Sequence, residues 1–494
     1  MKPMYQSVSA DRNCFLENTQ VALQVKIATK DLQVERVLGV RCTADVTSYE
    51  CLEGSVVFLG KAHYKLLVWG DGRMESLNYH ADFSDKIEHP SLTPQSKPEF
   101  RVQPVDVRIR SVSDGEIVVD SVLSVDLYQT ERTSANVLTD CEEVCCKHAP
   151  QRTYTQRKIE GQFETEYRAA LHKDVSKVLF AESGVDITSV STQTDSVLLA
   201  GSTYTYLAFL TPEGEIETEI FEVPYTEEVS AVGATTESVA NVFARTDGTK
   251  VQLDLGENTS TLSFQVKVVV SGRVTLTCPV DSVEDAYSLT HGISLETQTL
   301  ESTRNVTFLS VAGKAEGNVE VEEALIGQRP SSFLNPCVTV VEAKPFENSV
   351  VTEGVLTGYV VYGGEQPQSV PAEIPFRIVS EVQDVTPTCR VEATGTVTDI
   401  VCRKGVNGAE IVAVMKLQLN VSCSEQTVVA TDCISGEEKT PSGAAIEVFF
   451  GRKGQTLWEV CKTLNATEEE ILECNPSLQL PLQGGERILI YRKA

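Results

Sequence analysis

Long apolar runs are missing from the sequence, and their absence argues against a membrane-spanning helix. Apolar stretches such as residues 266–270 are short and are interrupted by charges such as Lys267, whereas a spanning helix needs about 20 predominantly apolar residues. The first residues, 1–7, also lack the apolar core of a secretory signal peptide. We therefore expect a chain without a transmembrane segment that is made and kept in the cytosol.

Positive charge is also scarce. The chain carries 42 Lys and Arg against 70 Asp and Glu, which gives a formal net charge of −28. Such a surface repels the phosphates of nucleic acids and the headgroups of anionic lipids, so we predict no nucleic-acid partner. A hydrophobic fraction of 41% in 494 residues is nevertheless enough to build several buried cores.

No grouping of residues typical of an active site is visible. None of the six histidines has a second histidine at zinc-ligand spacing, and no phosphate-binding loop ends in Gly-Lys-Ser/Thr. Cys141, Cys145 and Cys146 with His148 form the one metal-like cluster, but their spacing differs from that of the usual zinc sites. The sequence therefore predicts no enzyme, no metal and no cofactor.

The 14 cysteines are mostly scattered singly through β-like stretches, as Cys389 and Cys423 are. Thiols stay reduced in the cytosol, and a single cysteine in a strand is more often a small buried apolar residue than a ligand. We expect these cysteines to be free.

What the chain does contain is a repeat. Gly60, Gly201 and Gly354 follow one another at intervals of 141 and 153 residues, each within a β-like run. A glycine-bearing turn and a second β-like run with an aromatic residue follow each of them, which is the pattern of a hairpin. These aromatic residues are Phe83, Tyr225 and Phe376. An aspartate recurs near the end of each copy, as Asp140, Asp285 and Asp432.

Alternating polar and apolar residues within the copies are typical of antiparallel sheets with one solvated face. We predict a mainly β fold in which three tandem β-sandwich-like repeats are followed by a small βααβ domain. The polar segments 131–156 and 282–305 are interpreted as junctions. The expected divisions are repeat 1 at 1–145, repeat 2 at 146–290, repeat 3 at 291–435, a linker at 436–445 and the last domain at 446–494.

The last domain has the signals of strand, helix, helix and strand in order. Thr456 is a good helix N-cap, and Thr467 with Glu470 fits a capping box. Asn475-Pro476 ends the second helix, because the residue before proline avoids the α region. Trp458 is interpreted either as an anchor in the core or as part of a binding face.

This order, with Gly454-Gln455-Thr456-Leu457-Trp458 at the first turn and Asn475-Pro476 after the second helix, resembles the LysM family. The resemblance implies a groove between the first turn and the loop after the second helix, where many LysM domains bind polymers of N-acetylglucosamine. The implied binding residues are Lys453, Gly454, Gln455, Thr456, Leu457, Asn475, Pro476, Ser477 and Leu478.

The repeats resemble a domain of unknown function found in tandem in spore-forming Firmicutes, and residues 285–288 are similar to an exit motif of that family. Together with one C-terminal LysM domain, they resemble the SipL-like spore-coat morphogenetic proteins of clostridia. The resemblance implies an adaptor in the mother-cell cytosol, at the forespore surface, that docks through LysM onto SpoIVA, the coat-base ATPase, with other coat proteins as further candidate partners. The alternative is a protein that binds peptidoglycan through LysM.

Overall fold

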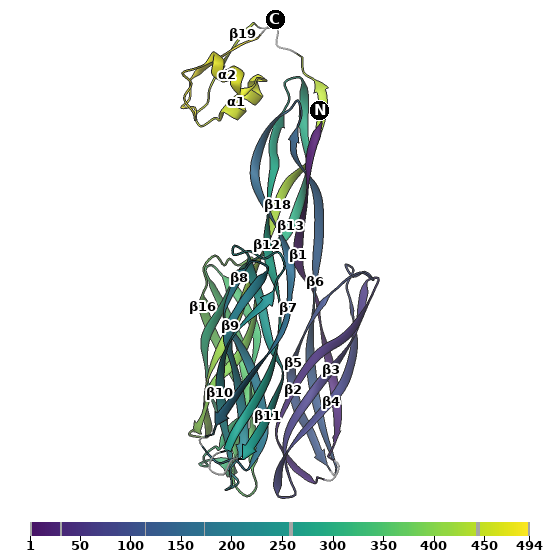
Figure 1. The fold of residues 1–494 in the computed structure, drawn as a ribbon, viewed down its shortest axis with the longest axis vertical. Helices are drawn as coiled ribbons and strands as arrows, with labels where there is room; N and C mark the ends of the chain where they lie inside the picture. Colours follow the sequence, from purple (N-terminus) through teal and green to yellow (C-terminus); the bar gives the residue numbers. More distant parts are fainter. Residues whose placement is uncertain are drawn as a thin grey trace.

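The chain folds almost entirely into β-strands, as the sequence predicts, with two short helices near its C-terminus (Figure 1). This computed structural model describes residues 2–29, 32–113, 115–171, 173–255, 260–440 and 445–492. Within these ranges no helix is long and apolar enough to span a bilayer.

The strands fall into three sets of six, which we call the first, second and third units, and a terminal module. The first unit contains β1 (Pro3–Ala28), β2 (Val34–Leu52), β3 (Ser55–Gly70), β4 (Arg73–Glu88), β5 (Glu99–Ser113) and β6 (Glu116–Cys141). The second contains β7 (Cys145–Ala170), β8 (Lys177–Gln193), β9 (Ser196–Leu210), β10 (Ile216–Ser230), β11 (Val239–Leu255) and β12 (Ser260–Tyr287). The third contains β13 (His291–Glu320), a 3-10 turn (Glu323–Leu325), β14 (Ser332–Phe346), β15 (Ser349–Tyr362), β16 (Gln368–Glu381), β17 (Arg390–Lys404) and β18 (Gly408–Glu438). The terminal module contains β19 (Ile446–Phe450), α1 (Leu457–Leu464), α2 (Glu468–Cys474) and β20 (Arg487–Tyr491).

Each unit pairs its six strands in the same way. The last strand lies between the first and the fifth, and the third lies between the second and the fourth, so each unit has two three-stranded antiparallel sheets. In the first unit both sheets contribute to one buried core, with Val25 from β1, Phe58 from β3 and Leu123 from β6. The two sheets therefore face each other across that core.

The recurring glycines sit directly opposite the recurring aromatic residues. Gly60 pairs with Phe83, Gly201 with Tyr225, and Gly354 with Phe376 (the last pair in the third unit). A Cβ on Gly201 would lie 2.0 Å from the backbone oxygen of Asp186 and 2.8 Å from the Tyr225 hydroxyl. The aromatic ring therefore covers a glycine that has no room for a side chain, which explains why the two residues recur together.

Gly201→Ala is accordingly expected to lower the free energy of unfolding by about 1–3 kcal/mol, because the new methyl group overpacks the sheet. Urea denaturation followed by circular dichroism measures this change. Gly292→Ala is the control, since its nearest atoms to an added Cβ lie at 3.8 Å or more, and it should differ from the parent by less than about 0.5 kcal/mol. Equal effects of the two substitutions would contradict the pairing.

The ends of the longest strands extend beyond the other strands of each unit and together form a stalk that leads to the terminal module (Figure 1). These strands are β1, β6, β7, β12, β13 and β18. Most of segments 131–156 and 282–305, interpreted from the sequence as junctions, is strand: β6 ends only at Cys141 and β7 begins at Cys145, and β12 and β13 are separated by three residues, so the connections between units are confined to 142–144 and 288–290. In the expected linker, β18 continues to Glu438, while residues 441–444 lie outside the described residues.

Residues at equivalent positions of the three units meet in the stalk. Leu138, Val283 and Ala430 each stand two places before the recurring aspartate, and all three are buried in one cluster at the stalk tip. Near the other end of the units, Leu67, Ala208 and Val361 each stand seven places after the recurring glycine and share another cluster. Three equivalent positions can meet twice only if the units surround a common axis, so the chain is a single-chain pseudo-trimer.

The recurring aspartates end this stalk in the same way in each unit. The Oδ1 atoms of Asp140, Asp285 and Asp432 accept hydrogen bonds from the next backbone N–H at 2.8, 2.9 and 2.8 Å. In each case the strand register shifts at the preceding residue. The aspartate thus stabilises a β-bulge at the tip, which is a physical reason for its recurrence.

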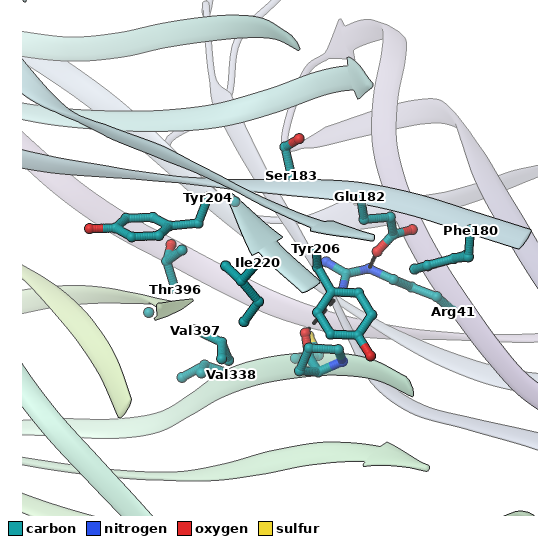
Figure 2. A pocket seen from close by; sticks show the side chains of 14 residues that line it. Arg41, Phe180, Glu182, Ser183, Tyr204, Tyr206, Ile220, Val338, Thr396 and Val397 are labelled. Atoms are coloured by element: carbon teal, nitrogen blue, oxygen red, sulfur yellow. Dashed lines mark hydrogen bonds and ion pairs between the residues drawn. The ribbon is translucent and has the colours of Figure 1, made fainter. Parts of the chain in front are cut away.

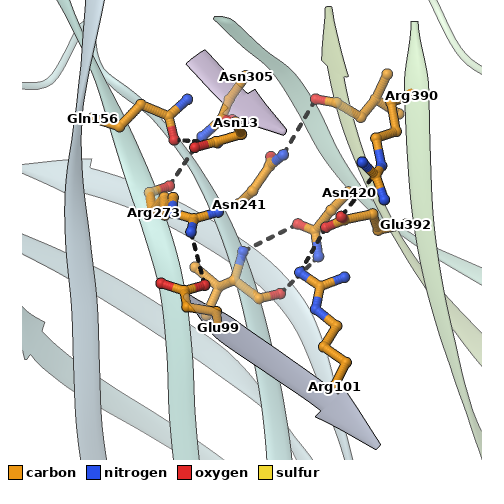
Figure 3. Close-up of polar contacts among 12 residues, drawn as sticks. Asn13, Glu99, Arg101, Gln156, Asn241, Arg273, Asn305, Arg390, Glu392 and Asn420 are labelled. Carbon is orange, nitrogen blue, oxygen red and sulfur yellow. Dashed lines mark hydrogen bonds and ion pairs between the residues drawn. The ribbon is translucent and has the colours of Figure 1, made fainter. Parts of the chain in front are cut away.

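Polar contacts also join the units to one another (Figure 3). Arg101 of the first unit bonds to Glu392 of the third at 2.8 Å, and its guanidinium lies 4.3 Å from the ring centroid of Phe243 in the second. Nearby, Asn420 accepts from the Val242 N–H at 3.1 Å and donates to its carbonyl at 2.9 Å. Side chains of all three units therefore contact one another here.

One expectation about cysteine is wrong. Cys389 and Cys423 are joined by a disulfide, with their Cα atoms 4.3 Å apart. Cys389 immediately precedes β17, whose first residue Arg390 pairs with Ser422 of β18. The strand register brings the two residues together, and their separation of 34 positions hides this proximity in the sequence. The 12 other cysteines are free.

Candidate docking site on the terminal module

The helices of the terminal module begin where the sequence predicts. The Thr456 side chain accepts from the N–H of Glu459, and Glu459 bonds back to the N–H of Thr456. Thr467 and Glu470 form the same reciprocal pair at the start of α2, so the predicted capping box is confirmed. Each pair satisfies two backbone donors that a helix start leaves open.

The first predicted segment lies on a turn that is fastened by its backbone. The N–H of Gly454 donates to the Leu482 carbonyl at 2.8 Å, and Gly454 has φ +81°, which favours glycine. Lys453, Gly454 and Thr456 are exposed, whereas Gln455 and Leu457 are half-buried. This hydrogen bond joins the first turn to the far end of the loop that follows α2.

The second predicted segment divides into a structural residue and a free loop. The Asn475 amide donates to the carbonyls of Ile471 and Leu489, both at 2.7 Å, and accepts from the Leu489 N–H at 2.8 Å. It is buried and clamps α2 to β20. Pro476 and Ser477 are exposed, and Leu478 is half-buried against the module core. Of the predicted residues, Lys453, Gly454, Thr456, Pro476 and Ser477 are thus the ones that face solvent.

A contact between the terminal module and the tip of the second unit was not predicted. The indole Nε1 of Trp458 donates to Asp285 at 2.9 Å, and the Lys462 ammonium donates to the other oxygen of Asp285 at 2.6 Å. The rings of Trp458 and Tyr287 meet edge to face with centroids 4.9 Å apart. Trp458 is half-buried against the module core, so it is at once a core residue and a contact residue.

The electrostatics of this contact are those of a paired carboxylate. Burial alone raises the pKa of Asp285, but hydrogen bonds from Lys462 and Trp458 outweigh burial and leave that pKa below its ordinary value. Burial raises the pKa of the Cys461 thiol beside Tyr287 to about 11. This cysteine is therefore a neutral core residue at neutral pH rather than a reactive thiolate.

A second candidate site is a cavity of about 190 Å³ between the units (Figure 2). The Arg41 guanidinium lies 2.5 Å from Glu182 there, and Val338 and Thr396 of the third unit close the other side. Burial lowers the pKa of Arg41, and the Glu182 carboxylate more than offsets this effect. The charges in the cavity satisfy each other, so we interpret it as a joint between units. Among the described residues, no group of three or more His, Cys, Asp or Glu side chains is arranged to hold a metal ion.

Comparison with known proteins adds one similarity. Residues 334–404, which run from β14 to the end of β17 in the third unit, match the family model described as SipL, SPOCS domain. No curated protein and no solved structure matches the chain. The matched segment supports a SipL-like, sporulation-associated protein.

Proposed function

We propose that the chain is a non-enzymatic adaptor of spore coat or envelope assembly, which docks through its terminal module onto a SpoIVA-like coat-base ATPase at the forespore surface. The similarity of the third unit to the SPOCS domain of SipL supports a role in sporulation. The strand–helix–helix–strand order of the terminal module agrees with the resemblance to LysM.

The observation that carries the docking role is the placement of the terminal module. It lies at the end of the stalk, away from the sandwiches (Figure 1), and Lys453, Pro476 and Ser477 are open to solvent. A partner can reach these residues without meeting the three units. The Asn475 amide is already fully engaged within the module, so recognition relies on the exposed turn and loop.

Lys453→Glu in the full chain is expected to weaken binding to the ATPase about tenfold, because it reverses the charge of an exposed side chain on the docking face. Surface-immobilised ATPase and titration of the chain measure this affinity. Lys97→Glu, at another exposed site in the first unit, changes the net charge by the same amount and should bind as the parent does.

The same proteins are offered to chitin oligomers and to purified peptidoglycan. Retention of the parent on glycan without affinity for the ATPase would replace the proposed adaptor by a glycan-binding protein. Equal weakening of ATPase binding by both lysine variants would show that bulk charge acts instead of the docking face.

A further inference from the structure

The hydrophobic core of the terminal module includes a residue of another unit. Tyr287, the last residue of β12, is 3% exposed and packs in the same cluster as Val460, Ile471 and Ile488 of the module. Its hydroxyl donates to the carbonyl of Ala466, between α1 and α2, at 2.8 Å. A buried tyrosine whose hydroxyl is hydrogen-bonded contributes a large apolar contact area, and the hydrogen bond fixes the orientation of its ring. The module is therefore built around an aromatic side chain that the second unit supplies.

The tip of the second unit also supplies the charge that faces α1. Asp285 takes one hydrogen bond from Trp458 and one from Lys462, which stand four residues apart and so lie on the same face of the helix. Just after the end of β18, where the chain leads from the third unit toward the module, the Lys439 ammonium donates to the Ser288 carbonyl and to the Asn465 side chain, both at 2.7 Å. These contacts surround Tyr287 and fix the orientation of the module relative to the tip of the stalk.

The other two tips cannot hold the module in the same way. The positions equivalent to Tyr287, two places after the recurring aspartate, are Glu142 in the first unit and Ile434 in the third. Neither residue has a ring to enter the module core. In addition, Asp432 accepts from the hydroxyl of Tyr5 at 3.1 Å. The stalk thus has three pseudo-equivalent tips, and only that of the second unit has an aromatic residue at this position.

We propose that Asp285 and Tyr287 form an anchoring site for the terminal module, and that this anchor determines which face of the module is presented to a partner. The anchor covers the Trp458 and Lys462 side of α1 and leaves the Lys453 turn and the loop at Pro476 open. The statement about anchoring is independent of any partner, whereas the statement about presentation rests on the proposed docking function.

Two partner-free measurements on the full chain test the anchor. Trp69 and Trp458 are the two tryptophans, so a Trp69→Phe background makes Trp458 the reporter of its contact with Tyr287. Tyr287→Ala is expected to shift its emission to longer wavelength. Trypsin must bind the Lys439 side chain to cleave after it, and that side chain is engaged by the Ser288 carbonyl of the tip and the Asn465 side chain of the module. Tyr287→Ala should therefore speed cleavage at Lys439 about tenfold, because proteolysis follows the population of the open form.

Matched variants separate anchoring from a general loss of structure. Asp285→Ala and Asp140→Ala both remove an aspartate that caps a bulge, but only Asp285 contacts the module. Likewise, Ile434→Ala truncates the position equivalent to Tyr287. We expect the second-unit variants to release Lys439 and both control variants to leave it protected. Tyr287→Phe, which keeps the ring, should give an intermediate rate. Equal cleavage in all variants would overturn the proposed anchor.

The affinity for the coat-base ATPase tests presentation separately. If the parent binds and Asp285→Ala binds several-fold more weakly while Asp140→Ala does not, presentation by the anchor is supported. If the parent binds and Asp285→Ala binds equally well although Lys439 is released, presentation is refuted and the anchor stands. If the parent does not bind at all, the proposed docking function fails, and the result for anchoring is unaffected.

Discussion

Lys416→Met is expected to lower the free energy of unfolding by about 3–5 kcal/mol, one of the two largest effects that we predict. The Lys416 ammonium in β18 lies 3.1 Å from Asp186 in β8, which is completely buried between the third and second units. The other side chains that bond to this carboxylate are the hydroxyls of Ser310 and Thr188, at 3.1 and 3.3 Å. Without the lysine, a buried negative charge keeps only neutral partners.

Urea denaturation of the full chain measures this effect, and two further variants serve as a control and as a rescue. Lys314→Met removes a surface ion pair with Glu316, in which both side chains are 56% exposed, and such pairs contribute at most about 1 kcal/mol. Adding Asp186→Asn to Lys416→Met should recover part of the lost stability, because the unpaired charge disappears with it. A Lys416→Met protein as stable as the Lys314→Met protein would contradict the burial of this pair.

The features that sequence reasoning found are those set by neighbouring residues or by a regular interval. The capping residues Thr456 and Thr467 depend on contacts three residues away. The pairing of Gly201 with Tyr225 arises within one hairpin and recurs in the other units. The recurring aspartate was visible as a pattern, and its role as a cap of a bulge needed the strand register.

What sequence reasoning missed depends on contacts between units. The stalk strands read as polar junctions because six strands pack around a narrow apolar centre, so that most of their side chains face water. Asp285 and Tyr287 were visible as a motif that the other repeats match only in part. Their contact with Trp458 joins residues 173 positions apart, and no local pattern encodes such a distance.

The pseudo-trimer differs from a true trimer in the residues that fill equivalent places. Glu99, Asn241 and Glu392 occupy corresponding positions of the three fifth strands, and Glu99 pairs with Arg273 whereas Glu392 pairs with Arg101. The three units have thus become specific for one another, and the distinct tip of the second unit, with its aromatic residue, belongs to the same divergence.

Val429→Asp is the second substitution for which we expect a loss of at least about 3 kcal/mol, since it places an unpaired carboxylate in the stalk centre. Val429 is completely buried in a cluster with Val8 and Val137 of the first unit and Val280 of the second. The residues of this cluster are all apolar, so none of them offers a partner to a carboxylate at this place.

The neighbouring residue provides the control, because successive side chains of a strand point to opposite faces. Val428 is 52% exposed, and Val428→Asp should change the free energy of unfolding by less than about 0.5 kcal/mol. Urea denaturation compares the free energies of unfolding of the two variants, and the rate of trypsin cleavage at Lys439 reports whether the contacts at the tip are intact. We expect Val429→Asp to release Lys439 as well, because the anchor at Tyr287 is held in place by the strands that this cluster joins. Equal stability of the two variants would mean that the three strand pairs do not share a core. A destabilised Val429→Asp protein with Lys439 still protected would instead show that the contacts at the tip do not depend on the cluster in the stalk.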